Sequence, residues 1–579
     1  MLQTYTKEYA NILSQHLPLS TEELQSQITL APENIAGDFA FPCFQLAKTL
    51  GKSPLEISKE LEGKLKTNQL FEKFVATGPY LNAFISSQQL ANDILSEIQT
   101  KKADYGKGDP TNKQILIEGR NANTHKALHI GHLRNILVSE SLARIIAYAG
   151  NEVVSVCYPG DIGAHVAKWI WYYLNFYEGE LPENNFTQRV GDIYTKATLK
   201  VDENPDQYKA DIAELQKKLE DGDPELQKVW KETRELCLKD FVRILNELGS
   251  TKIDKRYFES EVEQLGIEIV KKMLADGIAE HSQGAVAINL EDYKLGRFLL
   301  LKSTGASLYS TKDIALAYKK REDYPNYDAS IYVVGSEQIH HFEQLFKTLE
   351  IIGFDPSKLK HLAYGLLDLK EGKMSSRAGN VILYETFRDQ LLQKANEMMA
   401  ERNISAEEKT ETAKAIAFGA MKFQILLQDS EKKILFDEET ALSFEGETGP
   451  YIQYTYARIA SIIKKSIPLM KGEDSQSESG GSNDLDYTLL NTEEDKKLLL
   501  QIAKLPEEVQ KAAQGYKPNY VARFCLDTAQ LFNSYYHNHK IIDETNPELS
   551  KARLALSQTV QQVLKNGLEL LSIDVVESM

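Results

Sequence analysis

Residues 114–156 restrict the fold of this chain more than any other stretch. QILIE at 114–118 is a short, largely apolar run that predicts a buried strand, and EVVSV at 152–156 predicts a second one. Between them the sequence predicts a helix over 133–150 that ends at Gly150. Its apolar stripe, at i, i+3, i+4 spacing, comprises Leu133, Ile136, Leu137, Leu142, Ile145 and Ile146. Two strands joined by a helix form a βαβ unit, so we expect a parallel sheet.

The junction between the first strand and the helix carries ANTHKALHIGH at 122–132. The unpaired N–H groups and the dipole of a helix start favour anions, which makes this junction a candidate phosphate site. Gly131 lets a phosphate or a flat ring approach the backbone, and Lys126 adds a positive charge. His129 and His132 are one helical turn apart, so their rings can face the same side. The alternative is that the two histidines only cap the helix.

At 579 residues the chain exceeds the size of a single core, so we expect several domains. We predict a small N-terminal unit over 1–105 and a catalytic domain over 106–400 with an insertion at about 165–300. Strand–helix alternation resumes at about 285 with GAVAINL, FLLLKS and SIYVVG. The helical remainder divides into a stem over 401–470, a polar loop over 471–486 and a final domain over 487–579.

Composition is that of a soluble globular protein, with 42% hydrophobic and 26% charged residues and no apolar run long enough to span a bilayer. The start, MLQTYTKEYANILSQH, lacks the features of a signal peptide. The four cysteines form no CxxC pair, so we expect a cytoplasmic protein without disulfides or a structural zinc. The net charge of −17 opposes binding to a polyanion, so any RNA surface must be a local basic patch.

A second motif is EGKMSSRAGN at 371–380, a basic segment bounded by glycines. Lys373 and Arg377 could close over a triphosphate, although most such segments are simply exposed loops. With this motif the chain resembles class I aminoacyl-tRNA synthetases. Their HIGH and KMSK signatures match residues 129–132 and 373–377 in order and separation.

The resemblance is closest to arginyl-tRNA synthetases and covers essentially the whole chain. Similar blocks are GDFAFPCFQLAK (37–48), GPYLNAF (78–84), SLYSTKDIALA (307–317), VGSEQIHHF (334–342), FEGETGPYIQYTYARIASI (444–462) and RLALSQTVQQVLKNGLELL (553–571). The fold class it implies is α/β, with a Rossmann-type parallel-sheet catalytic domain bearing an insertion. A small N-terminal α+β domain and a C-terminal all-α helical bundle complete it. The implied activity is ATP-dependent activation of L-arginine and its transfer to the 3′-terminal adenosine of tRNA(Arg), with adenylate formation requiring tRNA.

A guanidinium has five donors in a planar fork and a permanent charge, so its pocket needs carboxylates and other acceptors. The resemblance carries the arginine site onto Glu118, Asn123, Glu259, Tyr309, Asp313 and Gln338. Glu259 and Asp313 would face the guanidinium, with Tyr309 and Gln338 beside it. Glu118 and Asn123 would hold the α-amino and carboxylate end of the substrate. Each has a plain alternative: Asp313 could cap a helix, Glu259 could be a solvated charge, and Gln338 could be a surface amide.

The resemblance assigns catalysis to Lys126, His129, His132 and Lys373. The implied ATP site comprises Ala122, Asn123, Lys126, His129, Ile130, Gly131, His132, Lys373, Met374, Ser375 and Ser376. Arginine carboxylate would attack the α-phosphate in line, with Mg²⁺ entering on ATP and no metal site of the protein's own. Two departures from the family pattern stand out. Ser376 occupies the position of the second KMSK lysine, a role we give to Lys126, and Arg120 is a bulky cation near the expected arginine site.

Anticodon contacts are the least specified by sequence. Tyr516, Tyr520 and Tyr535 are candidates for stacking on unpaired bases, whereas we expect Phe524 and Phe532 to be buried. We expect a monomer whose partners are tRNA(Arg), L-arginine and ATP.

Alternative functions fit the sequence less well than an arginyl-tRNA synthetase does. Small-molecule nucleotidyltransferases also use an HxGH helix start, but such chains are short. A non-catalytic, synthetase-like RNA-binding protein would have lost the phosphate cluster, which is intact here. A synthetase for glutamate or glutamine should carry cations in place of Glu259 and Asp313. A Rossmann dehydrogenase does not fit, because no GxGxxG follows QILIE.

Overall fold

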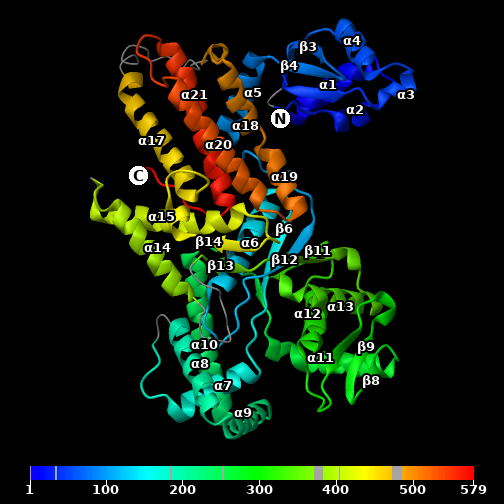
Figure 1. Ribbon diagram of the computed structural model, residues 1–579, viewed down its shortest axis with the longest axis vertical. Helices are drawn as coiled ribbons and strands as arrows, with labels where there is room; N and C mark the ends of the chain where they lie inside the picture. Colours follow the sequence, from blue (N-terminus) through cyan, green and yellow to red (C-terminus); the bar gives the residue numbers. More distant parts are fainter. Residues whose placement is uncertain are drawn as a thin grey trace.

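The computed structural model describes residues 2–32, 35–182, 186–250, 253–370, 382–402, 404–471 and 485–579. Figure 1 shows a small N-terminal domain (blue) set off to one side and a central region that contains the main sheet. The long C-terminal helices (yellow to red) stand at one end of the molecule, and a group of inserted helices (teal) extends from the other.

The N-terminal domain is an antiparallel sheet of four strands in the order β1-β2-β4-β3, packed against helices. Its elements are α1 (Leu2–Ser14), α2 (Thr21–Gln27), β1 (Thr29–Leu30), β2 (Phe39–Pro42), α3 (Leu46–Leu50), α4 (Pro54–Lys64), β3 (Phe71–Thr77) and β4 (Tyr80–Ile85). Tyr9, Phe71 and Phe74 pack ring against ring in its core. Capping boxes at Ser20 and Ser53 fix the starts of α2 and α4.

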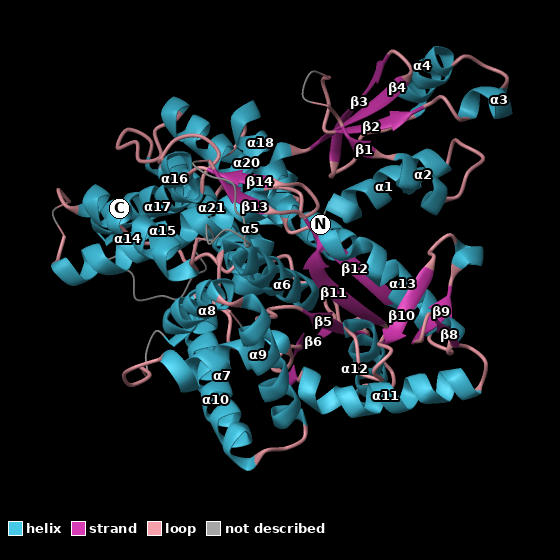
Figure 2. Ribbon diagram, turned by 60° about the horizontal axis from the view of Figure 1, so that its bottom comes forward, coloured by secondary structure: helices cyan, strands magenta, loops and turns pink. Residues whose placement is uncertain are grey.

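Five parallel strands form the central sheet, in the order β12-β11-β5-β6-β7 (Figure 2). They are β5 (Gln114–Glu118), β6 (Glu152–Cys157), β7 (Lys255–Arg256), β11 (Ala329–Gly335) and β12 (Leu359–Tyr364). The predicted βαβ unit is confirmed, with α6 (Ile130–Tyr148) as its helix. From β5 the chain adds β6 and β7 on one side of the sheet, and then β11 and β12 on the other side, so the strand order switches between β5 and β11. A ligand crevice is expected outside the carboxyl ends of the strands at such a switch point.

Both faces of this sheet are covered, so β5 buries alternate residues in opposite directions. Ile115 and Ile117 belong to the core beneath α6, while Leu116 packs with Leu316 on the other face. All six predicted stripe residues of α6 are at most 2% exposed. Glu118 is two residues after Leu116 in the same strand, so its side chain points to the same face, the one that Leu316 covers. The hydrophobic pattern of β5 thus aims the Glu118 carboxylate at α12, at the carboxyl end of the sheet.

Two insertions interrupt the sheet domain. The first holds α7 (Ala164–Phe176), α8 (Phe186–Glu203), α9 (Pro205–Glu220) and α10 (Pro224–Glu247). The second holds α11 (Glu259–Ala275), β8 (Glu280–Ser282), β9 (Ala285–Asn289), η2 (Glu291–Tyr293) and β10 (Arg297–Leu301). Next come α12 (Tyr309–Asp323), η3 (Ser336–Gln338), α13 (Ile339–Ile351) and η4 (Pro356–Lys358). GAVAINL and FLLLKS, expected to continue the parallel alternation, instead form a separate antiparallel sheet, β10-β9-β8. The link between β9 and β10 is too short for a parallel crossover.

The C-terminal region is helical, as predicted, apart from one short strand. It comprises α14 (Tyr384–Met399), α15 (Ala406–Leu427), α16 (Glu438–Leu442), α17 (Gly449–Lys471), η5 (Tyr487–Leu489), α18 (Glu493–Ala503), α19 (Leu505–Gly515), α20 (Asn519–Asn538) and α21 (Pro547–Leu570). The exception, β14 (Ile434–Phe436), pairs in parallel with β13 (Leu367–Leu369). Within the described part of the chain, no helix has the length and apolar composition needed to cross a bilayer.

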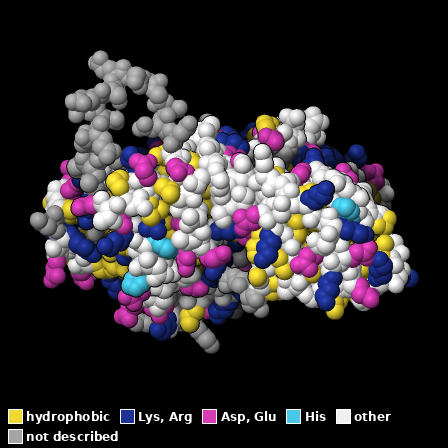
Figure 3. Space-filling model, turned by 90° about the horizontal axis from the view of Figure 1, so that it is seen from above, with side chains coloured by type: hydrophobic (Ala, Val, Ile, Leu, Met, Phe, Trp, Pro, Cys, Tyr) yellow, Lys and Arg dark blue, Asp and Glu magenta, His cyan; other side chains and the backbone are white. Residues whose placement is uncertain are grey.

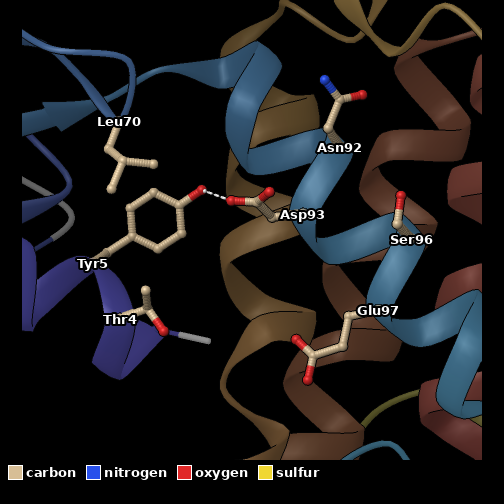
Figure 4. Close-up of a pocket in the computed structure, with 7 residues that line it drawn as sticks. All are labelled: Thr4, Tyr5, Leu70, Asn92, Asp93, Ser96 and Glu97. Carbon is tan, nitrogen blue, oxygen red and sulfur yellow. Dashed lines mark hydrogen bonds between the residues drawn. The ribbon is translucent and has the colours of Figure 1, made fainter.

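The N-terminal domain meets the helical body through α5 (Ser87–Lys101), which is followed by η1 (Lys102–Asp104). The sequence grouped α5 with the N-terminal unit, but it packs against α18 and α21. Figure 4 shows the junction, a cavity of about 500 Å³ in which the Tyr5 hydroxyl donates to Asp93 Oδ2 at 2.7 Å. In a second contact, Lys496 Nζ of α18 lies 2.7 Å from Asp38 Oδ2 of the N-terminal domain. These contacts hold the N-terminal domain against the C-terminal helices.

Candidate active site

The HIGH segment forms the start of α6 at the carboxyl edge of β5. His129 is the N-cap residue, and its Nδ1 accepts a hydrogen bond from the Gly131 N–H at 3.1 Å. His132 Nδ1 in turn accepts from the His129 N–H at 3.3 Å. The ring centroids lie 3.9 Å apart, so the two imidazoles face the same side. The capping role posed as an alternative is therefore real, and it is compatible with a phosphate site.

This capping arrangement fixes the chemistry of both rings. Burial, with the charge of Lys126, lowers the pKa of His129 to about 4 and places that of His132 well below its usual range. Both rings are therefore neutral near pH 7. Because Nδ1 of each ring accepts a hydrogen, the ring proton resides on Nε2. The helix start thus presents two neutral N–H donors and the nearby ammonium of Lys126.

The KMSSR residues Lys373, Met374, Ser375 and Ser376 lie outside the described part of the chain. The segment that follows them, however, is bound to the HIGH segment. The Ile130 N–H donates to the Ile382 carbonyl at 3.2 Å, and the Tyr384 N–H donates to the Leu128 carbonyl at 3.0 Å. These hydrogen bonds hold residues 382–384 directly beside the histidine pair.

Glu259 and Asp313 are the two carboxylates expected to bind a guanidinium. Glu259 is the first residue of α11, and Asp313 is the fifth residue of α12. Glu259 is 7% exposed, and its Oε2 accepts from the Lys312 ammonium at 2.6 Å. Burial raises the pKa of this carboxyl, and Lys312 opposes the shift. Asp313 Oδ2 lies 2.7 Å from His341 Nε2. Glu259 is therefore no solvated charge, and Asp313 does not cap α12, whose N-cap residue is Leu308.

Gly160 marks the point where the two ends of the expected arginine site converge. A Cβ on Gly160 would lie 2.7 Å from Asn123 Oδ1 and 2.8 Å from Glu259 Oε1. Only glycine leaves room there, and its own N–H donates to Asn123 Oδ1 at 3.2 Å. The crevice therefore brings Asn123 and Glu259 close to one point.

The remaining predicted arginine contacts differ in environment. Glu118 is buried at the end of β5 and forms an ion pair with Lys320 of α12. Tyr309 is 66% exposed at the start of α12. Gln338 is exposed and ends η3, just beyond the carboxyl end of β11. Glu118 and Gln338 thus flank the switch point from its two adjacent strands.

Arg120 turns away from the crevice. Its side chain is fully buried, and its Nη2 donates to Glu140 Oε2 on α6 at 2.8 Å. Its φ of +58° accompanies this turn into the interior. A guanidinium next to the expected arginine site is therefore kept out of it.

Tyr158, which follows β6 at the carboxyl edge of the sheet, is a pocket residue that the sequence analysis missed. Among the described residues its buried hydroxyl has no hydrogen-bond partner. Burial and the charges of Asp313, Glu259 and Glu118 raise its pKa well above the usual range, so it remains a phenol. A rule that flags every polar residue just after a parallel strand would have found it.

One candidate for stacking on RNA is wrong. Tyr535 is 2% exposed, and its hydroxyl donates to Asp495 Oδ1 at 2.6 Å, so no base can reach its ring. Tyr516 is half-buried, whereas Tyr520 is 41% exposed. Phe524 and Phe532 are buried, as predicted.

A second group of aromatic and basic side chains adjoins the end of α20. A pocket of about 750 Å³ there is lined by Tyr536, Arg458, Lys465 and Lys540, among others. Tyr536 is 40% exposed, and Arg458 lies over its ring at 5.4 Å from the centroid. On the face in Figure 3, Lys and Arg side chains alternate with Asp and Glu and form no continuous basic field. This face therefore carries no extended basic patch.

Comparison with known proteins identifies the family. Residues 94–437 match the model of the class I (R) tRNA synthetase catalytic domain, and 452–579 match the DALR anticodon binding domain. Residues 3–85 match the arginyl tRNA synthetase N-terminal domain. An arginine–tRNA ligase of Clostridium perfringens is 35% identical over 99% of this chain and 100% of its own length. One of Clostridioides difficile is 33% identical over the full length of both.

Comparison with solved structures gives the same family. The arginyl-tRNA synthetase of Thermus thermophilus superposes with a TM-score of 0.78 at 26% identity, covering 100% of both chains. That of Plasmodium falciparum, at 20% identity and a TM-score of 0.76 over 99% of both chains, shares the fold. Since a catalytic-domain model matches more than half of the chain and full-length relatives reach 35% identity, the chain belongs to the arginyl-tRNA synthetases of class I.

Proposed function

We propose that this protein is an arginine–tRNA ligase, which activates L-arginine with ATP and transfers it to tRNA(Arg). One observation carries the proposal. Two neutral histidine N–H donors and Lys126 line the same switch-point crevice as two carboxylates suited to a guanidinium. The first group suits a transferring phosphate, and the second suits the side chain of arginine.

In the activation step an arginine carboxylate oxygen bonds to the α-phosphorus of ATP while the bond to pyrophosphate breaks in line. Nε2–H of His129 and of His132 donate to the α-phosphate oxygens as negative charge builds on them. Lys126 supplies the fixed positive charge, and Lys373 adds its own from the KMSSR segment. No side chain acts as a nucleophile, because positioning and electrostatic stabilisation suffice.

Arginine is selected by charge and shape. Its guanidinium donates to Asp313 and Glu259, with Tyr309 and Gln338 beside it, and Tyr158 offers an oxygen acceptor. Glu118 and Asn123 hold the amino and carboxylate end. The Lys312 ammonium is bonded to Glu259 Oε2, so the guanidinium would donate to Oε1, the oxygen nearer Gly160. Lysine, with three donors on a point charge, cannot reproduce the planar fork.

The arginyl group then passes from the adenylate to the 2′-hydroxyl of the terminal adenosine, and AMP leaves. Within the described ranges, no group of three or more His, Cys, Asp or Glu side chains could hold a metal ion. We assign Mg²⁺ to the phosphates of the substrate ATP, because Mg²⁺ is commonly held by substrate phosphates and waters. We further propose that the enzyme acts as a cytoplasmic monomer and binds the anticodon at the Tyr536 pocket, with Tyr520 as a secondary contact.

Aminoacylation of total tRNA tests the assignment directly. Arginine, lysine, glutamate and glutamine are each offered with ATP, and the acid-precipitable label is measured. Charging with arginine alone supports the proposal. Charging with another amino acid would refute the assigned roles of Glu259 and Asp313.

A further inference from the structure

A buried cluster of charges lies behind the active site, on the C-terminal half of α6. Glu140, 1% exposed, binds Arg120 through Oε2 at 2.8 Å and Arg144 through Oε1 at 2.7 Å. The Ser250 hydroxyl also donates to Glu140 Oε2 at 2.8 Å. Glu140 thus joins the loop after β5, the helix that begins with the HIGH segment, and the chain returning from the first insertion.

Arg144 extends this cluster to the anticodon-binding region. Its Nη1 donates to the Glu569 carbonyl at 2.9 Å, and its Nη2 donates to the Gly249 carbonyl at 2.7 Å. One turn earlier on α6, the Ser141 hydroxyl donates to the Leu570 carbonyl at 3.0 Å. Glu569 and Leu570 are the last two residues of α21, and the Glu569 carbonyl also accepts from the Ser572 N–H at 3.0 Å. Side chains of α6 therefore bind the C-terminal end of α21.

At its other end the cluster fixes the loop that carries the predicted substrate contacts. Arg120 is two residues beyond Glu118, and its carbonyl accepts from Cys157 Sγ at 3.3 Å. The next residue is held as well: the Asn121 N–H donates to Asn135 Oδ1 of α6 at 3.2 Å, and Asn121 Oδ1 accepts from the Tyr158 N–H at 2.7 Å. A displacement of Arg120 would therefore move the backbone between Glu118 and Tyr158.

An apolar cluster could fill this space without the cost of desolvating three charged groups. What charges add is directional geometry, because a bidentate carboxylate between two guanidinium groups tolerates few arrangements. The cluster is thus suited to holding the loop and α21 in a defined relation to each other.

We propose that Arg120, Glu140 and Arg144 are positioning residues that couple tRNA binding on the C-terminal helices to the geometry of the arginine-binding loop. This inference rests on the proposed arginine–tRNA ligase function. Arg144 binds the end of α21, and Glu140 binds both Arg144 and Arg120. A shift of α21 would therefore move Arg120 and, with it, the loop at 118–123. None of the three touches substrate.

Arg144→Met tests the coupling with little risk to folding, since the Arg144 side chain is 28% exposed and the Arg120–Glu140 pair stays intact. Calorimetry measures the Kd of arginine with and without tRNA, and the ratio of the two values is the coupling factor. In Arg144→Met we expect this factor to fall at least about fivefold towards one. The Kd of tRNA alone should change less than about twofold, because coupling and intrinsic affinity are separate quantities.

Three further variants sharpen the result. Arg144→Lys keeps the charge and should recover part of the coupling. Ser141→Ala removes only the contact to Leu570 and should reduce the factor to a smaller extent. Arg297→Met, whose ion pairs lie on the surface of the small antiparallel sheet, should match the unmodified protein.

The proposal is overturned if Arg144→Met and Ser141→Ala keep the coupling factor of the unmodified protein, or if tRNA does not alter arginine affinity in that protein. Failure of the ligase function is distinguishable, since the unmodified protein would then charge no tRNA with arginine. Normal charging with an unchanged coupling factor would refute the positioning role alone.

Discussion

Asp313→Asn is the most informative single change in the proposed guanidinium pocket. Asparagine has nearly the same shape, and its amide oxygen can keep the 2.7 Å contact with His341 Nε2. The negative charge is lost, and the second carboxylate oxygen is replaced by an NH₂ group that cannot accept from the guanidinium. A hydrogen bond to a charged group contributes about 1.5–3 kcal/mol. At about 1.4 kcal/mol for each factor of ten, kcat/KM for arginine should fall about 10- to 150-fold.

ATP–pyrophosphate exchange with saturating tRNA measures this effect, with arginine and ATP varied separately. The KM for ATP should stay within about twofold, because Asp313 lies on α12 rather than at the start of α6. Asp323→Asn, at the last residue of the same helix and paired with Lys255 at 2.9 Å, is the matched control. A loss below threefold for arginine, or an equal loss for ATP, would refute the guanidinium role.

The other predictions concern phosphate, pH and RNA. Lys126→Met should lower kcat about 100-fold or more with little change in either KM, and a loss confined to KM would contradict a role in the transition state. Because the pKa of His129 is lowered to about 4 and that of His132 also falls well below its usual range, both rings stay neutral, so neither should reduce kcat between pH 6 and 8. An essential imidazolium would instead make kcat fall tenfold per pH unit above its pKa. The unfolded chain protonates these rings near pH 6.5 and the folded chain does not, so their contribution to stability is complete above that pH and declines towards pH 4, which melting curves can follow. Tyr536→Ala should raise the Kd of tRNA about 5- to 150-fold if a base stacks there, whereas Tyr535→Phe should lower the melting temperature and leave tRNA affinity nearly unchanged.

Local patterns predicted the centre of the fold well. The βαβ unit follows from the apolar runs of β5 and β6 and the stripe of α6, all of which are local in sequence. The strands β9 and β10 were recognised, but their antiparallel pairing depends on how the chain closes between them. Side-chain direction was harder still, since helical spacing cannot tell whether Tyr535 or Tyr536 faces the core.

In the candidate site, too, contacts between residues close in sequence were predictable and contacts between distant residues were not. The histidine pair is local, so its geometry was predictable from the spacing of HIGH. Partners far apart in sequence were not, including His341 for Asp313 and Lys320 for Glu118. Arg120 illustrates the limit, because its partner Glu140 lies on the next helix and nothing in residues 119–121 indicates that the side chain turns inward.

ATP–pyrophosphate exchange with arginine, lysine, glutamate and glutamine, each with and without tRNA, tests the proposed arginine activation. We expect exchange with arginine alone, and only in the presence of tRNA. Exchange with another amino acid would contradict the assigned pocket. No exchange under any condition, from folded protein that binds tRNA, would contradict catalysis itself.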